Sequence, residues 1–419
     1  MQKIRNSIDN INSYLLMLTA FFLPLTVFGG NFFAVLIFLL WIIKADFKND
    51  FHRLKNNKLV IAVFLYLLIH VIALLWTSDM EFGLYTLRKQ LKFLFIPIFI
   101  LFVKREHVKY YISAFLLSMS LSTVWSYGIW LELLPLYGGA TLNDPIPLMS
   151  RITYTPFLTI AIYLLLYYVL FNPLIGNLKK VTYCLLISAM SINIFITGGR
   201  AGQVMFLAML VITVFQYFSG RLFKAFLASS IVLLSTFSTA YWASEIFKYR
   251  INIAVSEFVN YKEFLLETPP HNKKFVGSSV GERMVFSASS WDIFIEHPIL
   301  GVGTGDFKDE FAKKLSINAP YVEKVENPHN MYALIGAQFG LLGLMTLLYM
   351  FYVQIKIALS SNEEFVRKIG IALPLLYLLI MLSDSYLMVH MTGLLFIFIS
   401  SFIYKDYEAD MQYRLKTIK

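Results

Sequence analysis

The sequence predicts an all-α protein that crosses a membrane many times, and three observations support this fold class. Of its 419 residues, 58% are hydrophobic and only 15% are charged, against about 25% charged in soluble domains. Apolar runs of roughly 20 residues, the length that crosses the ~30 Å hydrocarbon layer as a helix, recur along the chain. These runs do not alternate polar and apolar residues as barrel strands do. Because a bilayer offers the backbone no water, helices remain as the spanning structure.

The apolar runs predict about twelve spans, and the charges between them predict an orientation. The segments on one predicted side hold 21 of the 36 lysines and arginines, whereas the short segments on the other side hold only Arg151 and Arg200. By the positive-inside rule, the first side and both termini are cytoplasmic. The predicted spans are 14–30, 31–43, 59–76, 86–103, 110–132, 153–171, 180–197, 201–218, 223–243, 329–355, 366–386 and 390–404.

One external segment, residues 244–328, is long and polar and lies between the ninth and tenth predicted spans. Helical periodicity over 246–266 and 282–296 predicts that it forms a helical periplasmic subdomain. The chain therefore divides into a first group of spans at 1–243, a periplasmic helical loop at 244–328, and a last group of spans with a cytoplasmic tail at 329–419.

The composition narrows the class of function. A net charge of +10 is expected in a polytopic protein with basic cytoplasmic loops, so it predicts a lipid bilayer and not nucleic acid as the partner. The single cysteine excludes an intrachain disulfide. No H-x-x-x-H or H-E-x-x-H spacing occurs, and neither a metal nor a cofactor is predicted.

Arg200 is the first candidate for chemistry. It follows Thr197-Gly198-Gly199 in a turn barely long enough to connect two spans, so its guanidinium is expected at the outer membrane surface. Neighbouring glycines permit close backbone approach, and arginine binds phosphate in a bidentate way. The turn therefore predicts an anion site; the alternative is an arginine that only anchors a helix end.

His329 is the second candidate. In Asn327-Pro328-His329-Asn330, Asn327 is a favourable N-cap and Pro328 suits the first helical turn. His329 would then occupy a helix N-terminus, where the dipole disfavours the imidazolium and leaves a neutral ring. We expect a general base; the alternative is a histidine that anchors the interface.

Three further residues are weaker candidates. Arg283, at the start of the second loop helix, is by position alone a surface charge. Asp384, near the outer end of a span, is predicted to orient a sugar hydroxyl or to pair with an arginine. Arg88, with Lys89 and Lys92, starts the fourth span and could add to a rim that attracts phosphate, or simply anchor the interface.

Two glycine patterns predict structure. Gly336, Gly340 and Gly343 are spaced to make one smooth helix face for close packing. Residues 296–305 resemble a phosphate loop only superficially, because no Gly-Lys-Ser/Thr follows. We interpret them as a turn that lets the chain fold back, with Asp306 beginning the next helix.

These motifs together resemble the O-antigen ligases and the related O-antigen polymerases. His329-Asn330, followed nine residues later by Gly340-x-x-Gly343-Leu344, reproduces the family's His-Asn motif. The segment from His297 to Phe307 looks like the family's His-Pro-Leu-Leu-Gly-Val-Gly segment, and Thr-Gly-Gly-Arg200 looks like its small-residue turn. The motif-specific part of the resemblance runs from about 197 to 344.

The resemblance implies that Arg200 and Arg283 bind the pyrophosphate of an undecaprenyl-linked glycan, while His329 activates an acceptor hydroxyl without a metal. We include Asn330, Arg88 and Asp384 as substrate-binding candidates. Ser287, four residues after Arg283, departs from the apolar residue or tryptophan of relatives and puts the role of Arg283 in doubt.

The implied activity is inverting transfer of a polysaccharide to lipid A-core on the periplasmic face of the bacterial inner membrane. An O-antigen polymerase and a protein O-oligosaccharyltransferase share the donor chemistry and remain alternatives. A flippase or transporter is an alternative of another class, for which charged or helix-breaking positions are expected at mid-membrane.

Overall fold

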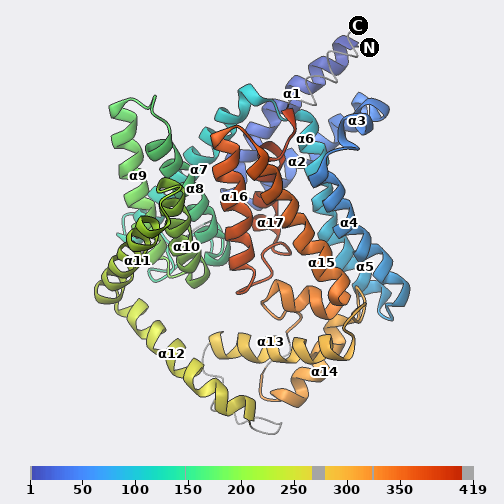
Figure 1. The fold of residues 1–419 in the computed structure, drawn as a ribbon, viewed down its shortest axis with the longest axis vertical. Coiled ribbons are helices and arrows are strands. Elements are labelled where there is room, and N and C mark those ends of the chain that lie inside the picture. The colour runs from blue at the N-terminus through green and yellow to red at the C-terminus, as the bar shows by residue number, and fades with distance from the viewer. Residues whose placement is uncertain (1, 147, 267–278, 323–324, 408–419) are drawn as a thin grey trace.

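The chain is all helix in a computed structural model that describes residues 2–146, 148–266, 279–322 and 325–407 (Figure 1). Its helices, with the short 3-10 helices marked η, are α1 (Gln2–Phe22), α2 (Val27–Lys44), α3 (Phe47–Leu54), α4 (Lys58–Ile72), η1 (Ala73–Trp76), α5 (Met80–Gln90), η2 (Leu91–Leu94), α6 (Phe95–Phe102), η3 (Arg105–His107), α7 (Val108–Trp130), α8 (Arg151–Phe171), α9 (Asn177–Ile196), α10 (Arg200–Tyr217), α11 (Leu222–Ala243), α12 (Glu245–Leu266), α13 (Ser279–Glu296), α14 (Phe307–Asn318), α15 (Met331–Ser360), α16 (Glu364–Ile380) and α17 (His390–Ile403).

Eight helical segments among the described residues are long and apolar enough to cross a membrane, and α17 is a shorter apolar helix. The prediction of an all-helical, multi-pass membrane protein is thereby confirmed. The total of twelve spans stays a prediction. The candidate spans are α2, α4 with η1, η3 with α7, α8, α9, α10, α11 and α15.

Three predicted spans differ from the helices observed. The predicted boundary between spans 14–30 and 31–43 is wrong, because α1 ends at Phe22 and Pro24 lies in the turn before α2. Gly29 instead lies inside α2, where an added Cβ would be 2.8 Å from the Phe22 side chain. The predicted span 86–103 is not one continuous α-helix but is divided among α5, η2 and α6.

The two ends of the bundle are held by different contacts. At one end Lys44 pairs with Asp50, Arg53 donates to the Leu101 carbonyl at 3.0 Å and Lys405 donates to the Val103 carbonyl at 2.7 Å. Helices α12, α13 and α14 gather at the other end, opposite the beginning of α1 (Figure 1). The predicted helices at 246–266 and 282–296 correspond to α12 and α13.

Helix α15 is broken at Gly340, whose φ of 60° and ψ of −152° are not helical. The glycine-rich segment 297–306, here called the clasp, replaces the helical hydrogen bonds lost at this break. Four backbone hydrogen bonds join the two: Val302 N to Ala337 O at 3.0 Å, Gly303 N to Gln338 O at 2.9 Å, Leu341 N to Pro298 O at 2.8 Å and Leu342 N to Ile299 O at 3.4 Å. The prediction that Gly340 belongs to a smooth packing face is therefore wrong.

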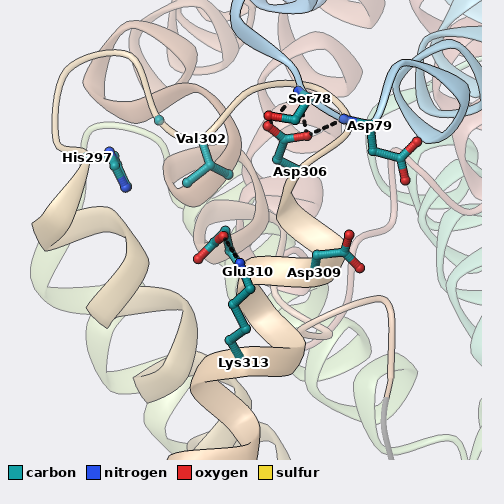
Figure 2. A pocket seen from close by; sticks show the side chains of 9 residues that line it. Ser78, Asp79, His297, Val302, Asp306, Asp309, Glu310 and Lys313 are labelled. Carbon is teal, nitrogen blue, oxygen red and sulfur yellow. Dashed lines mark hydrogen bonds and ion pairs between the residues drawn. The ribbon is translucent and has the colours of Figure 1, made fainter.

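The clasp also fastens α15 to the turn between η1 and α5. Thr304 Oγ1 donates to the His70 carbonyl at 2.7 Å. The Asp306 carboxylate accepts the backbone N–H groups of Ser78 and Asp79 at 2.7 to 2.9 Å, as Figure 2 shows. The segment predicted as a simple turn is thus a tertiary connection in which backbone groups are paired.

Candidate functional site

The glycine turn brings Arg200 to the first position of α10. Gly198 has a φ of +66°, and its carbonyl accepts a hydrogen bond from Arg250 at 2.5 Å. A Cβ added at Gly202 would lie 2.1 Å from Thr155 of α8. These glycines therefore allow α8 and α10 to approach closely where the arginine stands.

Arg200 lines a cavity of about 750 Å³ that receives arginines from four helices. Arg151 is the first residue of α8, Arg250 lies on α12 and Arg283 lies on α13. No aspartate or glutamate is among the described residues that line it. The structure thus brings together Arg200 and Arg283, as the sequence analysis predicted, and adds two guanidinium groups that it did not propose.

Arg200 is held in an environment that disfavours its charge. Burial has the largest effect, the charges of Arg250, Arg283 and Arg151 add to it, and Glu257 opposes them. Burial lowers the pKa of Arg250, and the charge of Arg151 lowers it further, whereas Asp144 opposes this shift. Like charges held in a half-buried cavity are unfavourable for the protein alone, so the cavity is suited to an anion.

The other walls of the cavity are apolar. Phe237 of α11 and Phe247 and Ile251 of α12 face it, together with Leu207 of α10. The first turns of α8 and α10 both contribute residues, so two helix N-termini add their partial positive charge to that of the arginines. The cavity therefore combines a site for concentrated negative charge with an apolar wall.

His329 lies outside the helix that was predicted to contain it. Helix α15 begins at Met331, and Asn330 is its N-cap, with its side-chain oxygen accepting the N–H groups of Tyr332 and Ala333. Asn327, predicted as the cap, instead accepts the His329 N–H at 3.0 Å. His329 has a φ of 52°. This backbone conformation is strained for a residue other than glycine, and such strain is often found at functional sites.

Asp384 contacts this histidine. His329 Nδ1 lies 3.2 Å from Asp384 Oδ2, and the aspartate side chain is buried while that of the histidine is one-third exposed. The rings of His329 and Phe286 are 6.1 Å apart. Asp384 was predicted to orient a sugar or to pair with an arginine, and neither alternative included this contact.

The pair lies beside the arginine cavity. Ser383 and Tyr386, which flank Asp384 in the chain, both line the cavity. On α13, Arg283 lines the cavity and Phe286, three residues later, faces His329. A short segment and a single helix therefore connect the anion site with the histidine.

Other predicted residues have different places. Arg88 is exposed on α5 and does not line the arginine cavity, whereas Lys89 and Lys92 line a second cavity. The Asn330 side chain caps α15, which is a structural role. Its proposed contact with substrate stays a prediction. Within the described part of the chain, no group of three or more His, Cys, Asp or Glu side chains is placed to hold a metal ion.

Comparison with protein families identifies the domain that contains most of this site. Residues 185–348 match a family model described as O-Antigen ligase. Over these residues the chain is similar to the O-antigen ligase family. The matched stretch runs from within α9 to within α15, and the resemblance found in the motifs is confirmed over it. A search of curated proteins found no match to the chain.

The matched stretch contains Arg200, Arg250, Arg283, His329 and the clasp, whereas Arg151 and Asp384 lie outside it. Arg151 precedes the matched stretch. The sequence distinguished it only as one of the two basic residues in the short segments of the predicted outer side. Asp384 follows the matched stretch by more than 30 residues. Arg250 carries no signal of its own, because it is one of several basic residues of a polar helix.

Proposed function

We propose that the protein is an O-antigen ligase that transfers a glycan from undecaprenyl pyrophosphate to a sugar hydroxyl of lipid A-core. The observation that carries the proposal is the convergence of four arginines in one cavity, whose described lining residues include no aspartate or glutamate. The similarity to the O-antigen ligase family supports the same chemistry. In this proposal the transfer takes place at the periplasmic face of the bacterial inner membrane. The chain has twelve spans, both termini are cytoplasmic, and the loop 244–328 is periplasmic.

The arginine cavity would hold the donor. Pyrophosphate is a compact dianionic group that several guanidinium groups can bind with charge-assisted, bidentate hydrogen bonds. The N-termini of α8 and α10 add to this field. The prenyl chain would leave along the apolar wall that includes Phe237 and Phe247.

The transfer itself needs a base on the acceptor side. The acceptor hydroxyl oxygen attacks the anomeric carbon, the bond from that carbon to the pyrophosphate oxygen breaks, and the electron pair stays on the pyrophosphate. Attack opposite the leaving group inverts the anomeric carbon. Asp384 near Nδ1 favours the tautomer of His329 whose Nε2 is unprotonated, so Nε2 takes the hydroxyl proton. The arginines stabilise the charge that develops on the leaving group.

A transporter was expected to show a broken helix, and α15 is broken at Gly340. The backbone groups freed by this break are hydrogen-bonded by the clasp, however. They are therefore engaged in tertiary structure and do not offer a substrate site, so this feature favours the enzyme over the transporter.

A complementation experiment tests the function. A deletion strain receives the wild type, Arg200→Ala or His329→Ala; lipopolysaccharide is resolved by gel, lipid-linked glycan is assayed in parallel, and protein levels are matched. For a ligase, the two variants leave core without polysaccharide while polymerised lipid-linked glycan accumulates.

Other results would replace the proposal. Single repeat units on core would indicate a polymerase, and unchanged lipopolysaccharide in the deletion strain would direct attention to a protein acceptor or a transporter. A variant with wild-type transfer would remove the role given to that residue.

A further inference from the structure

A second cavity, of about 480 Å³, is lined by residues close in the chain to both His329 and Asp384, among them Asn327. Met388, Val389 and His390 line it, whereas Ser383 and Tyr386 line the arginine cavity. The segment 383–390, here called the wall, thus contributes residues to both cavities.

A hydrogen-bonded connection leads from the second cavity to the histidine. Asn327 lines this cavity, and its side-chain oxygen accepts from the His329 N–H at 3.0 Å and from Ser385 Oγ at 2.9 Å. Ser385 follows Asp384, which contacts His329 Nδ1. A transferase with two substrates needs a second site near the base, and the Asn327 side chain connects this cavity with His329.

The charge of the second cavity is basic. Lys89 and Lys92 line it, and neither makes an ion pair with a residue that the structure describes. Lys92 Nζ donates to the carbonyls of Met388 and Val389, whereas Lys89 Nζ contacts only the face of the Tyr85 ring, 4.1 Å from its centroid. The acidic lining residue Glu326 pairs with Lys308 at 2.7 Å. Lys89 therefore has capacity for an anionic group of a ligand.

Gln338 supplies a second, independent observation. It lines the cavity with only 2% of its surface exposed, and its Nε2 donates to the Thr304 carbonyl at 3.2 Å. Its Oε1 is buried without a hydrogen-bond partner. A buried amide oxygen left unpaired is unfavourable, and a hydroxyl group of a bound sugar would satisfy it.

We propose that this cavity binds the acceptor, as a saccharide that carries a phosphate group. The phosphate binds Lys89, a sugar hydroxyl donates to Gln338 Oε1, and the reacting hydroxyl reaches His329 across the Asn327 side of the wall. The inference rests on the proposed function, and it assigns to the acceptor a site separate from the arginine cavity.

Binding measurements on the full-length protein in detergent test it. The probes are phosphorylated core oligosaccharide, the same oligosaccharide after dephosphorylation, and undecaprenyl pyrophosphate. Lys89→Gln should weaken binding of the phosphorylated core by about tenfold, the loss expected for one charge-assisted hydrogen bond, and should leave binding of undecaprenyl pyrophosphate unchanged. Dephosphorylated core should bind the wild type and Lys89→Gln equally.

The control is Lys313→Gln, which removes an exposed lysine of α14 that pairs with Glu310 and lines neither cavity of the site. Gln338→Leu tests the second contact and should weaken both forms of core; size-exclusion chromatography verifies its fold. Unchanged affinity of Lys89→Gln for phosphorylated core would overturn the inference while leaving the donor site intact. No binding of either core by the wild type would overturn both the inference and the acceptor named in the proposed function.

Discussion

The arginine cavity and the clasp differ in how their polar groups are satisfied, although sequence motifs mark both. In the clasp, backbone groups exposed by the break at Gly340 have partners, and the Asp306 carboxylate accepts hydrogen bonds from two backbone N–H groups. In the cavity, Arg200 is repelled by three other guanidinium groups, and no carboxylate is among the described residues that line the cavity. The clasp therefore stabilises the fold, whereas the cavity holds unfavourable charge that a ligand can relieve.

The largest expected effect comes from filling the clasp. Gly340→Ala places a Cβ 2.4 Å from the Ile299 backbone at a φ of +60°, and Gly301→Ala places one 2.3 Å from the Gln338 backbone at a φ of +66°. Each should lower the free energy of unfolding by about 3 kcal/mol or more. Membrane levels and thermal unfolding in detergent measure this loss. Gly176→Ala, where no atom lies within 4 Å of the added Cβ, is the matched control and should resemble the wild type.

Removing charge from the cavity should give the opposite pattern. Arg200→Ala is expected to lower the transfer rate by about 100- to 1,000-fold, the loss typical of one group that stabilises developing charge. The melting temperature should stay the same or rise, because repulsion from the other arginines is relieved. Transfer assays and thermal unfolding on the same preparation measure both. A fall in stability as large as that of Gly340→Ala would show that the cavity is structural.

Two aspartates sharpen the comparison. Asp384→Asn should lower transfer by about 100- to 10,000-fold with little change in stability, because the residue orients a base. Asp306→Asn should leave the transfer rate per folded molecule unchanged and lower the free energy of unfolding by about 1 to 3 kcal/mol, because a charged acceptor of backbone hydrogen bonds is lost. Transfer kinetics and unfolding curves of the two variants measure these effects. A stability loss in Asp384→Asn together with a transfer loss in Asp306→Asn would contradict the account.

The smallest effect concerns Asp144 at the edge of the arginine cluster. Burial raises its pKa, and this outweighs the opposing influence of Arg151 and Arg250. A raised pKa in the folded protein means that the carboxyl favours folding when protonated and that this contribution is lost as the pH rises through the folded pKa. Asp144→Asn should therefore raise the melting temperature by about 1 to 2 °C at pH 7.5. The difference should shrink towards pH 4, and a stabilisation that grows at low pH would contradict it.

The turn before Arg200 was recognised from the sequence because glycine and charge patterns are local. Arg283 became a candidate only through the family resemblance, and the structure brings the two arginines to one cavity. Arg250 was not recognised, because its place depends on α12 bringing it to the distant Gly198 carbonyl and not on its neighbours in the chain. Asp384 was noted as a buried charge, but its contact with His329 joins positions 55 residues apart.

The wrong predictions for His329 and for Gly340 arose where one local pattern fits two structures. Two asparagines flank Pro328 and His329, and the second one caps α15, so the helix begins later than predicted and His329 takes a positive φ. Gly340 fits a helix-packing spacing as well as it fits a helix break. Only the clasp, which lies about 40 residues earlier in the chain, determines that the break is stable.

The most direct test of the central claim is the affinity of the purified protein for undecaprenyl pyrophosphate and for undecaprenyl phosphate. The account predicts that the wild type binds the pyrophosphate more tightly, and that Arg200→Ala and Arg283→Ala each weaken that binding by about tenfold or more while reducing the preference for pyrophosphate. Equal affinities for the two lipids in the wild type, or unchanged affinity in both variants, would contradict the assignment of the arginine cavity to the donor.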